Sequence, residues 1–236
     1  MIVFYSHDIQ GGRAEFSEEE TRHCVQVLRK RQGDVIRFCD GRGMWYEGVI
    51  SEVGKRTFAA DIIRSWPEEV SAPDLHLAVA PVKQLERFEW LLEKATEIGV
   101  RRITPLVCAH SERVRLRHDR LLRILLAAMK QSMRASMPLL DELIAFESFL
   151  DTLDGESQKF IAHCRQPALP HFFRKIIPLR PVVLLIGPEG DFSDAEIQQA
   201  EAAGFASVSL GRARLRTETA AVVGCELVNL KNELGN

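Results

Sequence analysis

Two glycine-containing segments near the C-terminus have residue types that suit the binding of a small ligand. They are Ile186–Ser193 (IGPEGDFS) and Leu210–Ala220 (LGRARLRTETA), and the second carries the cation of Arg216 and the carboxylate of Glu218. Glycine lets a ligand approach the main chain, whose N–H groups can bind an adenine edge or a carboxylate. Each feature alone also fits a structural role, as a tight turn or as a salt bridge at a helix end. Two such segments in one domain favour a ligand site.

The elements around these segments predict a mainly parallel α/β sheet. Alternating Leu75, Leu77 and Val79 indicate a strand, and the apolar run Val182–Ile186 indicates a strand buried on both faces. Further strands are expected at 102–108, 159–164 and 208–210, and helices at 85–98, 119–134, 193–204 and 219–233. Because parallel sheets bind ligands beyond the carboxyl ends of their strands, both segments are predicted to lie at one sheet edge.

Residues 1–70 have a different, mostly β pattern. The first residues read as a strand, and Asp40-Gly41 is a hairpin signal. Ser17 and Glu20 form an S-x-x-E capping box that predicts one helix in this region. The segment 66–73 has two prolines and no periodicity, so it is interpreted as a linker. We therefore expect a domain over 1–70 and a second over 74–236.

The composition limits the classes of function. The chain has 236 residues, 46% of them hydrophobic, which allows a buried core, and no apolar run approaches the roughly 20 residues of a membrane helix. The N-terminus does not resemble a signal peptide, so we expect a cytoplasmic protein without membrane partners. The five cysteines form no C-x-x-C pair and the histidines show no metal spacing, so no metal is expected.

Charge is unevenly distributed along the chain. The net charge of −2 argues against a general nucleic-acid binder, yet basic residues are concentrated between Arg101 and Arg134. This stretch is interpreted either as a surface for phosphates or as a solvated helix face, and charge alone does not decide between them. The common nucleotide motifs G-x-G-x-x-G and G-x-x-x-x-G-K-[ST] are absent, as is the hydrolase motif G-x-S-x-G.

At the two C-terminal segments the sequence resembles the RsmE family of SPOUT-class methyltransferases. Gly187-Pro188-Glu189-Gly190 with Phe192-Ser193 and Glu196 is similar to its G-P-E-G-G-[FW]-[ST]-x-x-E segment, and 210–220 to its L-G-x-x-I-L-R-x-E-T-A segment. Matches upstream follow in family order over essentially the whole chain: His23–Arg29 with Gly33-Asp34, Lys83, Glu93–Val100 with Pro105, Ser111–Arg113, and Gln131-Ser132 with Arg134 and Pro138. Asp191, Lys130 and Arg214 depart from the family pattern.

The resemblance implies a PUA-like β-barrel over 1–70 that binds RNA and a trefoil-knotted SPOUT α/β domain over 74–236. It implies methylation of N3 of a uridine in 16S ribosomal RNA of the small subunit, with S-adenosylmethionine as cofactor and a homodimer as the assembly. Arg216 is the candidate for stabilising charge on the base, and Glu218 is a weaker candidate for accepting its proton. Glu218 could equally orient Arg216 or cap the last helix.

The resemblance also assigns binding residues to this sequence. The expected cofactor-binding residues are Leu185, Ile186, Gly187, Pro188, Glu189, Gly190, Leu210, Gly211, Leu215, Arg216 and Thr219. The expected RNA-binding residues are His23, Arg29, Lys30, Lys83, Arg113, Arg115, Gln131 and Arg134. For His23 simple packing is an open alternative, and for Arg115 a solvated helix face is another.

Three other functions compete with this interpretation. The chain could be a non-catalytic RNA-binding module, a SPOUT enzyme that acts on another RNA such as transfer RNA, or a metabolic α/β enzyme. The intact C-terminal motifs argue against the first, the whole-chain match argues against the second, and the absence of another cofactor signature argues against the third.

Overall fold

The computed structural model describes residues 2–69, 74–153, 155–166 and 168–234. The chain divides into two compact units, one formed by Met1–Val70 with Leu126–Met137 and the other by Ser71–Leu125 with Pro138–Asn236. The segment 126–137 thus groups with the N-terminal residues although it lies far from them in the sequence. Within the described residues, the first unit is built on a six-stranded sheet and the second on a seven-stranded sheet.

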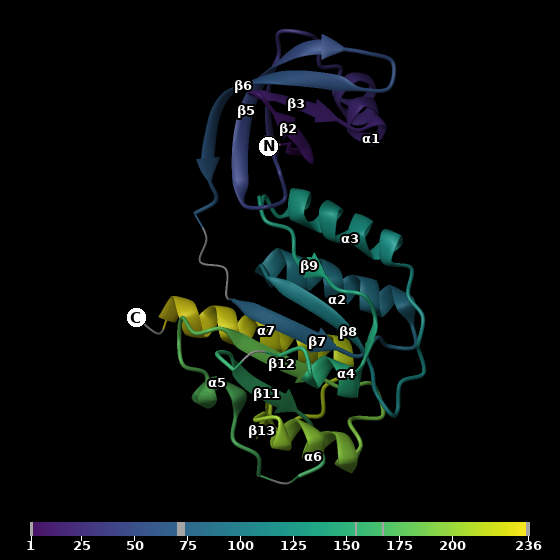
Figure 1. Cartoon of the computed structure of the whole chain (residues 1–236), viewed down its shortest axis with the longest axis vertical. Helices are drawn as coiled ribbons and strands as arrows, with labels where there is room; N and C mark the ends of the chain where they lie inside the picture. The colour runs from purple at the N-terminus through teal and green to yellow at the C-terminus, as the bar shows by residue number, and fades with distance from the viewer. Residues whose placement is uncertain (1, 70–73, 154, 167, 235–236) are drawn as a thin grey trace. The chain divides into compact units, whose positions relative to one another are not determined.

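The sheet of the first unit is curled and mostly antiparallel (Figure 1). Its order is β1-β4-β5-β6-β3-β2, and β1 pairs with β4 in parallel. The strands are β1 (Phe4–Tyr5), β2 (Asp8–Gln10), β3 (Arg13–Phe16), β4 (Val35–Cys39), β5 (Met44–Val53) and β6 (Phe58–Pro67). Its core contains Phe4, Phe16, Phe38 and Phe58, and the rings of Phe16 and Phe58 stack with centroids 4.1 Å apart.

One sequence prediction for this unit is confirmed and another needs correction. The Asp40 turn joins β4 to β5, with its Oδ1 accepting from the N–H groups of Arg42 and Met44. Trp66 and Pro67 lie in β6 rather than in a linker, because Trp66 pairs with Trp45 of β5. A proline at the end of a strand removes no central ladder bond, so the strand can include it. Residues 70–73 of the expected linker lie outside the described residues.

The expected helix at Ser17 forms with an altered geometry. Helix α1 (Glu18–Thr21) is followed directly by a π-helical turn, η1 (Arg22–Val27). Ser17 Oγ accepts from Glu20 N at 3.3 Å, so half of the predicted capping box is present. The Glu20 carboxylate instead forms an ion pair with Lys130, within the same unit. A carboxylate buried to 5% exposure needs such a charge partner, which explains why it does not return to the Ser17 main chain.

The sheet of the second unit is parallel throughout. Its order is β10-β8-β7-β12-β11-β13, and β9 also pairs with β8. The strands are β7 (Leu75–Val79), β8 (Arg102–Val107), β9 (Leu139–Leu140), β10 (Ile144–Ala145), β11 (Gln158–Ala162), β12 (Val182–Ile186) and β13 (Ala206–Val208). The predicted α/β class with a separate β-rich N-terminal part is therefore confirmed, and every residue of β12 is buried as expected.

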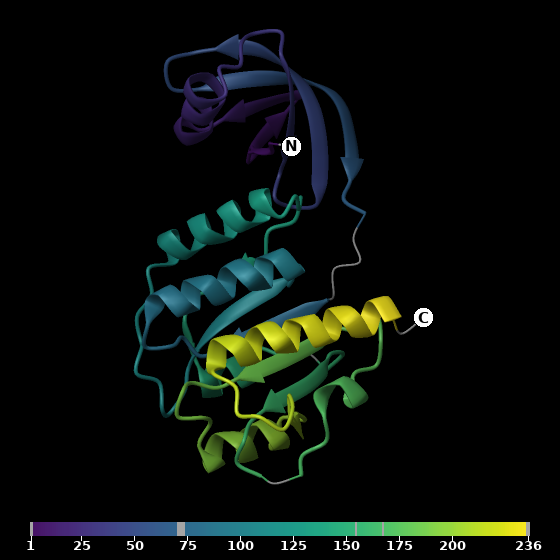
Figure 2. The ribbon, with the colours of Figure 1, turned by 180° about the vertical axis from the view of Figure 1, so that it is seen from behind.

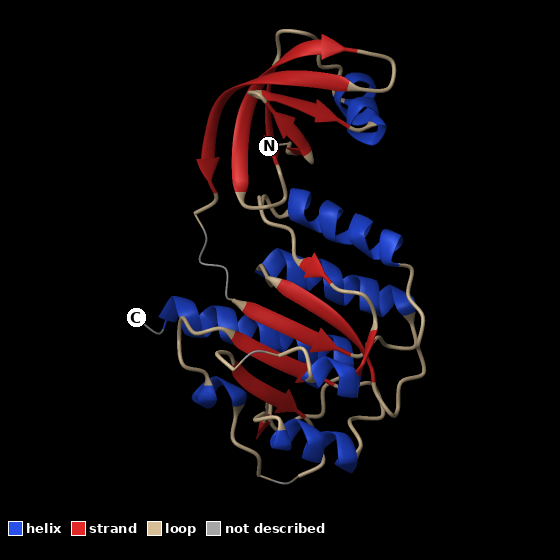
Figure 3. Ribbon diagram, in the orientation of Figure 1, coloured by secondary structure: helices blue, strands red, loops and turns tan. Residues whose placement is uncertain are grey.

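Helices cover both faces of this sheet (Figures 2 and 3). Helix α7 packs against β7 and β12 beside α2, as the view from behind shows, and α4 and α6 lie on the other face. The helices are α2 (Leu85–Ile98), α3 (His118–Gln131), α4 (Phe146–Leu150), α5 (Phe172–Lys175), α6 (Asp194–Ala202) and α7 (Thr217–Leu234). Gly99 ends α2 in the left-handed conformation, and Ser193 and Glu196 form a complete capping box for α6. No helix in the described part of the chain is long and apolar enough to cross a membrane.

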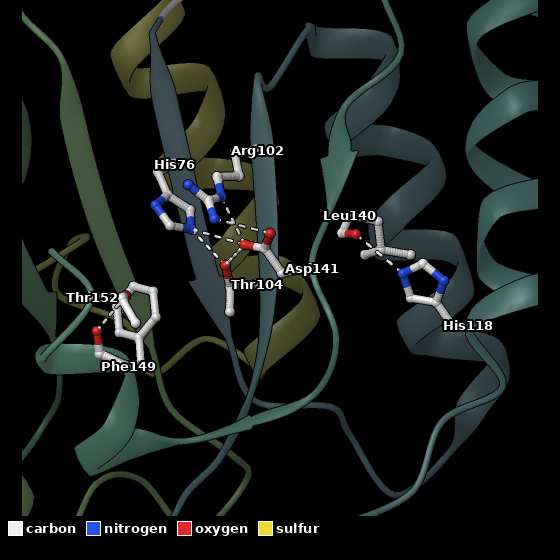
Figure 4. A network of polar contacts seen from close by, with 8 residues as sticks. All are labelled: His76, Arg102, Thr104, His118, Leu140, Asp141, Phe149 and Thr152. Carbon is white, nitrogen blue, oxygen red and sulfur yellow. Dashed lines mark hydrogen bonds and ion pairs between the residues drawn. The ribbon is translucent and has the colours of Figure 1, made fainter.

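A polar network lies near the N-terminal ends of β7 and β8 (Figure 4). Arg102 donates to both oxygens of Asp141, from Nε at 2.7 Å and Nη2 at 3.0 Å. Thr104 donates to Asp141, so His76 Nε2, 2.6 Å from the Thr104 hydroxyl, must donate to that hydroxyl. Burial alone would raise the pKa of Asp141, but the hydrogen bonds from Arg102 and Thr104 outweigh it and lower that pKa.

Candidate functional site

A cavity of about 350 Å³ lies at the carboxyl ends of β11 and β12. This is the edge at which an open parallel sheet binds ligands, and the volume is in the usual range for a small-molecule pocket. Its wall is formed by Arg87, Ala162, His163, Cys164, Ile186, Gly187, Pro188, Glu189, Asp191, Ser209, Leu210, Gly211, Ala213, Arg214, Leu215, Arg216, Thr217, Glu218 and Ala220. Both sequence-predicted segments therefore contribute to one cavity.

The segment after β12 forms one wall and is closely packed. A Cβ at Gly187 would lie 3.1 Å from both the ring and the main-chain nitrogen of Phe192, so a side chain there would require Phe192 to shift by a few tenths of an ångström. Phe192 is itself completely buried in the core below. The side chain of Glu189 extends back to accept from Lys83 N at 2.9 Å. This wall thus presents main-chain atoms to the cavity and is held in place by its neighbours.

The segment before α7 forms the opposite wall. Gly211 has φ +144°, a conformation that favours glycine, and Ser209 Oγ bonds to both N–H and C=O of Gly211. Thr217 Oγ1 donates to the Gly187 carbonyl at 3.0 Å, which joins the two walls directly. The predicted binding segments are thus linked through a side chain that the sequence did not single out.

The two candidate catalytic residues occupy different environments at the start of α7. Glu218 is buried and lies 3.5 Å from Arg87 Nη1 of α2, so it pairs with Arg87 rather than with Arg216. Arg216 is exposed on the cavity wall, and within the described residues its side chain forms no hydrogen bond or ion pair. The arrangement leaves the Arg216 guanidinium available to a ligand beside the cavity.

Most of the expected cofactor residues lie on the cavity wall, but three do not. Leu185 is a fully buried strand residue that pairs with Ile161. Gly190 lies outside the wall, where a Cβ would come within 2.9 Å of His110 Cβ. Thr219 is a half-buried residue of α7 that also lies outside the wall. These residues support the cavity rather than line it.

The sequence analysis missed the end of β11, which contributes Ala162, His163 and Cys164 to the wall. His163 is 6% exposed. Its Nδ1 accepts from Arg165 N at 3.2 Å, and its Nε2 has no hydrogen-bond partner among the residues that the structure describes. Burial lowers the pKa of His163, while the carboxylates of Asp191 and Glu201 act in the opposite sense. This strand end carries no glycine motif, and only its place beside β12 brings it to the cavity.

The expected RNA-binding residues of the second unit form a small cluster outside the cavity. Arg113 donates to the carbonyls of Val82 and Lys83 at 3.1 and 2.5 Å, so part of its guanidinium is used within the protein. Lys83 pairs with Glu112 at 2.8 Å, and Arg115 is exposed. Among the described residues Arg115 forms no ion pair, whereas Lys83 is paired with Glu112.

The expected RNA-binding residues of the first unit lie on η1 and near the end of α3. The His23 ring packs 5.9 Å from Phe4, in agreement with the packing alternative. Arg29 is exposed with φ +56°, and Lys30 Nζ donates to Val35 O at 3.3 Å. Gln131 is exposed and Arg134 is half-buried with an interaction partner.

Comparison with known proteins identifies the family. An RNA methyltransferase domain matches residues 69–229, and an RNA methyltransferase PUA domain matches residues 16–63. The chain belongs to this RNA methyltransferase family. A structure described as a probable rRNA-methyltransferase from Porphyromonas gingivalis is 36% identical and superposes with a TM-score of 0.93, with both chains covered completely.

Two further relatives of this RNA methyltransferase have more specific names. The ribosomal RNA small subunit methyltransferase E of Bacillus subtilis is 24% identical, over 92% of this chain and 89% of the relative. The enzyme of that name from Neisseria gonorrhoeae, in a structure bound to S-adenosyl methionine, is 25% identical with a TM-score of 0.84 over 99% and 98% of the two chains. Among the residues described for this methyltransferase, no cluster of three or more His, Cys, Asp or Glu side chains could hold a metal ion.

Proposed function

We propose that this methyltransferase transfers a methyl group from S-adenosylmethionine to N3 of a uridine in 16S ribosomal RNA of the small subunit. The observation that carries the proposal is the single cavity at the sheet edge, formed by both C-terminal motif segments. Relatives along nearly the whole chain named ribosomal RNA small subunit methyltransferase E, one of them bound to S-adenosyl methionine, support the substrate and the cofactor.

The cavity suits S-adenosylmethionine in size and in chemistry. Ile186, Pro188, Leu210 and Leu215 offer apolar contacts for a purine, and main-chain groups at Gly187 and Gly211 can be approached closely. Arg216 and Glu189 add charged groups at the wall. When bound, the cofactor supplies an electrophilic methyl group. We assign Leu185, Gly190 and Thr219 to supporting positions behind this surface.

The protein must present the base and manage the proton on N3. Neutral uracil carries that proton, and its loss spreads negative charge onto the two carbonyl oxygens. We assign Arg216 to stabilise this charge, because a cation placed where charge develops contributes strongly to catalysis. Glu218 is the candidate proton acceptor, and its ion pair with Arg87 would hold the carboxylate in position for that role.

RNA binding is assigned to residues on both units. N3 lies on the Watson–Crick edge, so the base must be unpaired or flipped out, as in exposed RNA loops. Lys83, Arg113 and Arg115 are proposed contacts from the second unit, and both Lys83 and Arg115 are exposed. His23, Arg29, Lys30, Gln131 and Arg134 are proposed contacts from the first unit. We further propose a cytoplasmic homodimer with a PUA-like barrel over 1–70 and a trefoil-knotted domain over 74–236.

The test is methyl transfer from radiolabelled S-adenosylmethionine to small ribosomal subunits isolated from a strain that lacks the modification. Reverse transcription then maps the product, because a methyl on N3 blocks base pairing and stops the polymerase. We expect one new stop at a uridine of 16S RNA. Cofactor binding without incorporation would reject this substrate in favour of another RNA, and absence of both would favour a non-catalytic RNA-binding module.

A further inference from the structure

Asp191 is a cavity residue whose main-chain conformation and contacts are unusual. Its φ is +63°, in the left-handed region that residues other than glycine, asparagine and aspartate rarely adopt. It lies on the cavity wall between the β12 segment and α6. Two of its own carboxylate contacts hold it there, so the conformation is fixed by the local structure.

The contacts of Asp191 distinguish its main-chain carbonyl from its carboxylate with respect to the cavity. Its main-chain carbonyl lies 2.9 Å from His110 Nδ1, and His110 is not a wall residue. Its carboxylate Oδ1 accepts from Phe192 N at 2.8 Å. Its Oδ2 accepts from the main-chain N of the wall residue Cys164 at 2.9 Å. The carboxylate therefore is the part of Asp191 that meets the cavity wall. Each carboxylate oxygen therefore accepts one main-chain N–H group.

Among the described residues, none of the cavity-wall cations Arg87, Arg214 and Arg216 forms an ion pair with this carboxylate. Glu218 pairs with Arg87, and Glu189 accepts from the Lys83 main chain. Within the described residues no arginine, lysine or histidine forms an ion pair with Asp191. His163, another wall residue, has a pKa lowered by burial, which favours the neutral ring. An ionised carboxylate at a ligand cavity with only main-chain donors is suited to attract a positively charged ligand group.

We propose that the Asp191 carboxylate is a positioning group that binds the cationic part of the cofactor. This inference rests on the proposed function, because S-adenosylmethionine carries two such groups, the sulfonium and the α-ammonium. The proposed role depends on the charge of Asp191. Asparagine removes that charge and retains one of the two oxygens that accept from N–H groups. The family motif usually has glycine at this position, so the contact would distinguish this chain from relatives with that glycine.

The experiment measures dissociation constants by calorimetry for the full chain and for Asp191→Asn. Asparagine also tolerates the left-handed conformation, so the fold should be retained. Three ligands separate the cations: S-adenosylmethionine, S-adenosylhomocysteine, which lacks the sulfonium charge, and methylthioadenosine, which lacks the amino-acid group as well. We expect S-adenosylmethionine to bind roughly fivefold more weakly to the variant, and methylthioadenosine equally to both.

The pattern of losses decides the outcome. Weakening of S-adenosylmethionine alone assigns the sulfonium, and weakening of both amino-acid ligands assigns the ammonium. Equal weakening of all three ligands, or of none, overturns the proposal. Failure of the unmodified protein to bind S-adenosylmethionine would instead overturn the proposed function itself. Asp191→Gly should reproduce the effect, and Asp194→Asn, an exposed residue outside the cavity, is the matched control that should leave all three constants unchanged.

Discussion

In the parallel sheet of the second unit, a charged network at the N-terminal edge is fully paired, whereas Arg216 at the C-terminal edge is not. At the N-terminal edge, Arg102 donates twice to Asp141, and Thr104 and His76 complete the network (Figure 4). At the C-terminal edge, Arg216 is exposed and its side chain has no partner among the described residues. Complete pairing stabilises the fold, whereas an unpaired cation beside a cavity remains available to a ligand.

This difference predicts that substitutions at one edge of the sheet affect stability and that substitutions at the other affect the proposed function. The network residues are bound to one another, so a substitution there leaves partners without hydrogen bonds. Arg216 at the cavity has no such partner among the described residues, so we expect its substitution to act on a bound ligand rather than on the fold. We therefore expect changes at one edge to lower the free energy of unfolding and changes at the other to lower catalysis or affinity.

The largest effect is expected from Arg216→Ala. Removing the cation proposed to stabilise charge on the base should lower the rate of methyl transfer by about 100- to 1,000-fold, with cofactor affinity and thermal stability nearly unchanged. Single-turnover transfer to small subunits measures the rate. Arg212→Ala, in the same segment but outside the cavity wall, is the control. A variant as active as the unmodified enzyme would remove Arg216 from the mechanism.

The next effect is expected from Asp141→Ala at the opposite edge. Losing the carboxylate leaves Arg102 and Thr104 without their acceptor, and should lower the free energy of unfolding by about 2–3 kcal/mol. Because the folded pKa is lowered, the stabilisation by Asp141 is present above its unfolded value and is lost as pH falls through the folded one. Urea unfolding measures it, with exposed Glu142→Ala as control. A large loss of cofactor affinity at full stability would contradict the separation of the two edges.

A smaller effect is expected from Gly187→Ala. The added Cβ would press on Phe192, so the wall must shift, at a cost of about 1–2 kcal/mol in stability. The shift should also weaken cofactor binding, which makes this the substitution that affects both properties. Thermal unfolding and calorimetry measure the two effects. Gly155→Ala has open space around its Cβ and should change neither. Unaltered binding would show that the Gly187 main chain does not contact the cofactor.

The smallest effect is expected from His163→Gln, and it appears only in the pH dependence of the free energy of unfolding. The lowered folded pKa means that the unfolded chain takes up the proton more readily, so His163 destabilises the folded state as pH falls below its ordinary value of 6.5. The unmodified protein should therefore lose stability relative to the variant between about pH 7 and about pH 5. Chemical unfolding at several pH values measures this difference. Parallel curves for both proteins would show that His163 remains solvated.

The sequence predicted those parts of the site that have a local signature. The segments at Gly187 and Gly211 stand out because glycine, a buried strand and a helix start occur together in each. The end of β11 has no such signature, and His163 reaches the cavity only because β11 pairs with β12 and β13. The pair Arg87–Glu218 joins α2 to α7, and such long-range partners depend on the order of strands and helices rather than on local spacing.

The fold shows the same limit. The helix 85–98 and the strand 182–186 were predicted with the bounds observed, because their apolar periodicity is strong. The short elements β9, β10, α4 and α5 were not predicted, since each has five residues or fewer and is stabilised by neighbours rather than by its own pattern. The π-helical turn at 22–27 was missed because apolar spacing does not distinguish it from an α-helix.

The glycine-rich walls of the cavity have a consequence for how this enzyme family can evolve. Gly187 and Gly211 present only backbone, and backbone atoms persist when neighbouring side chains are exchanged by mutation. Binding through main-chain atoms depends on the backbone conformation rather than on the identity of the side chains. An inhibitor directed at these backbone groups would offer the protein few single-residue routes to resistance.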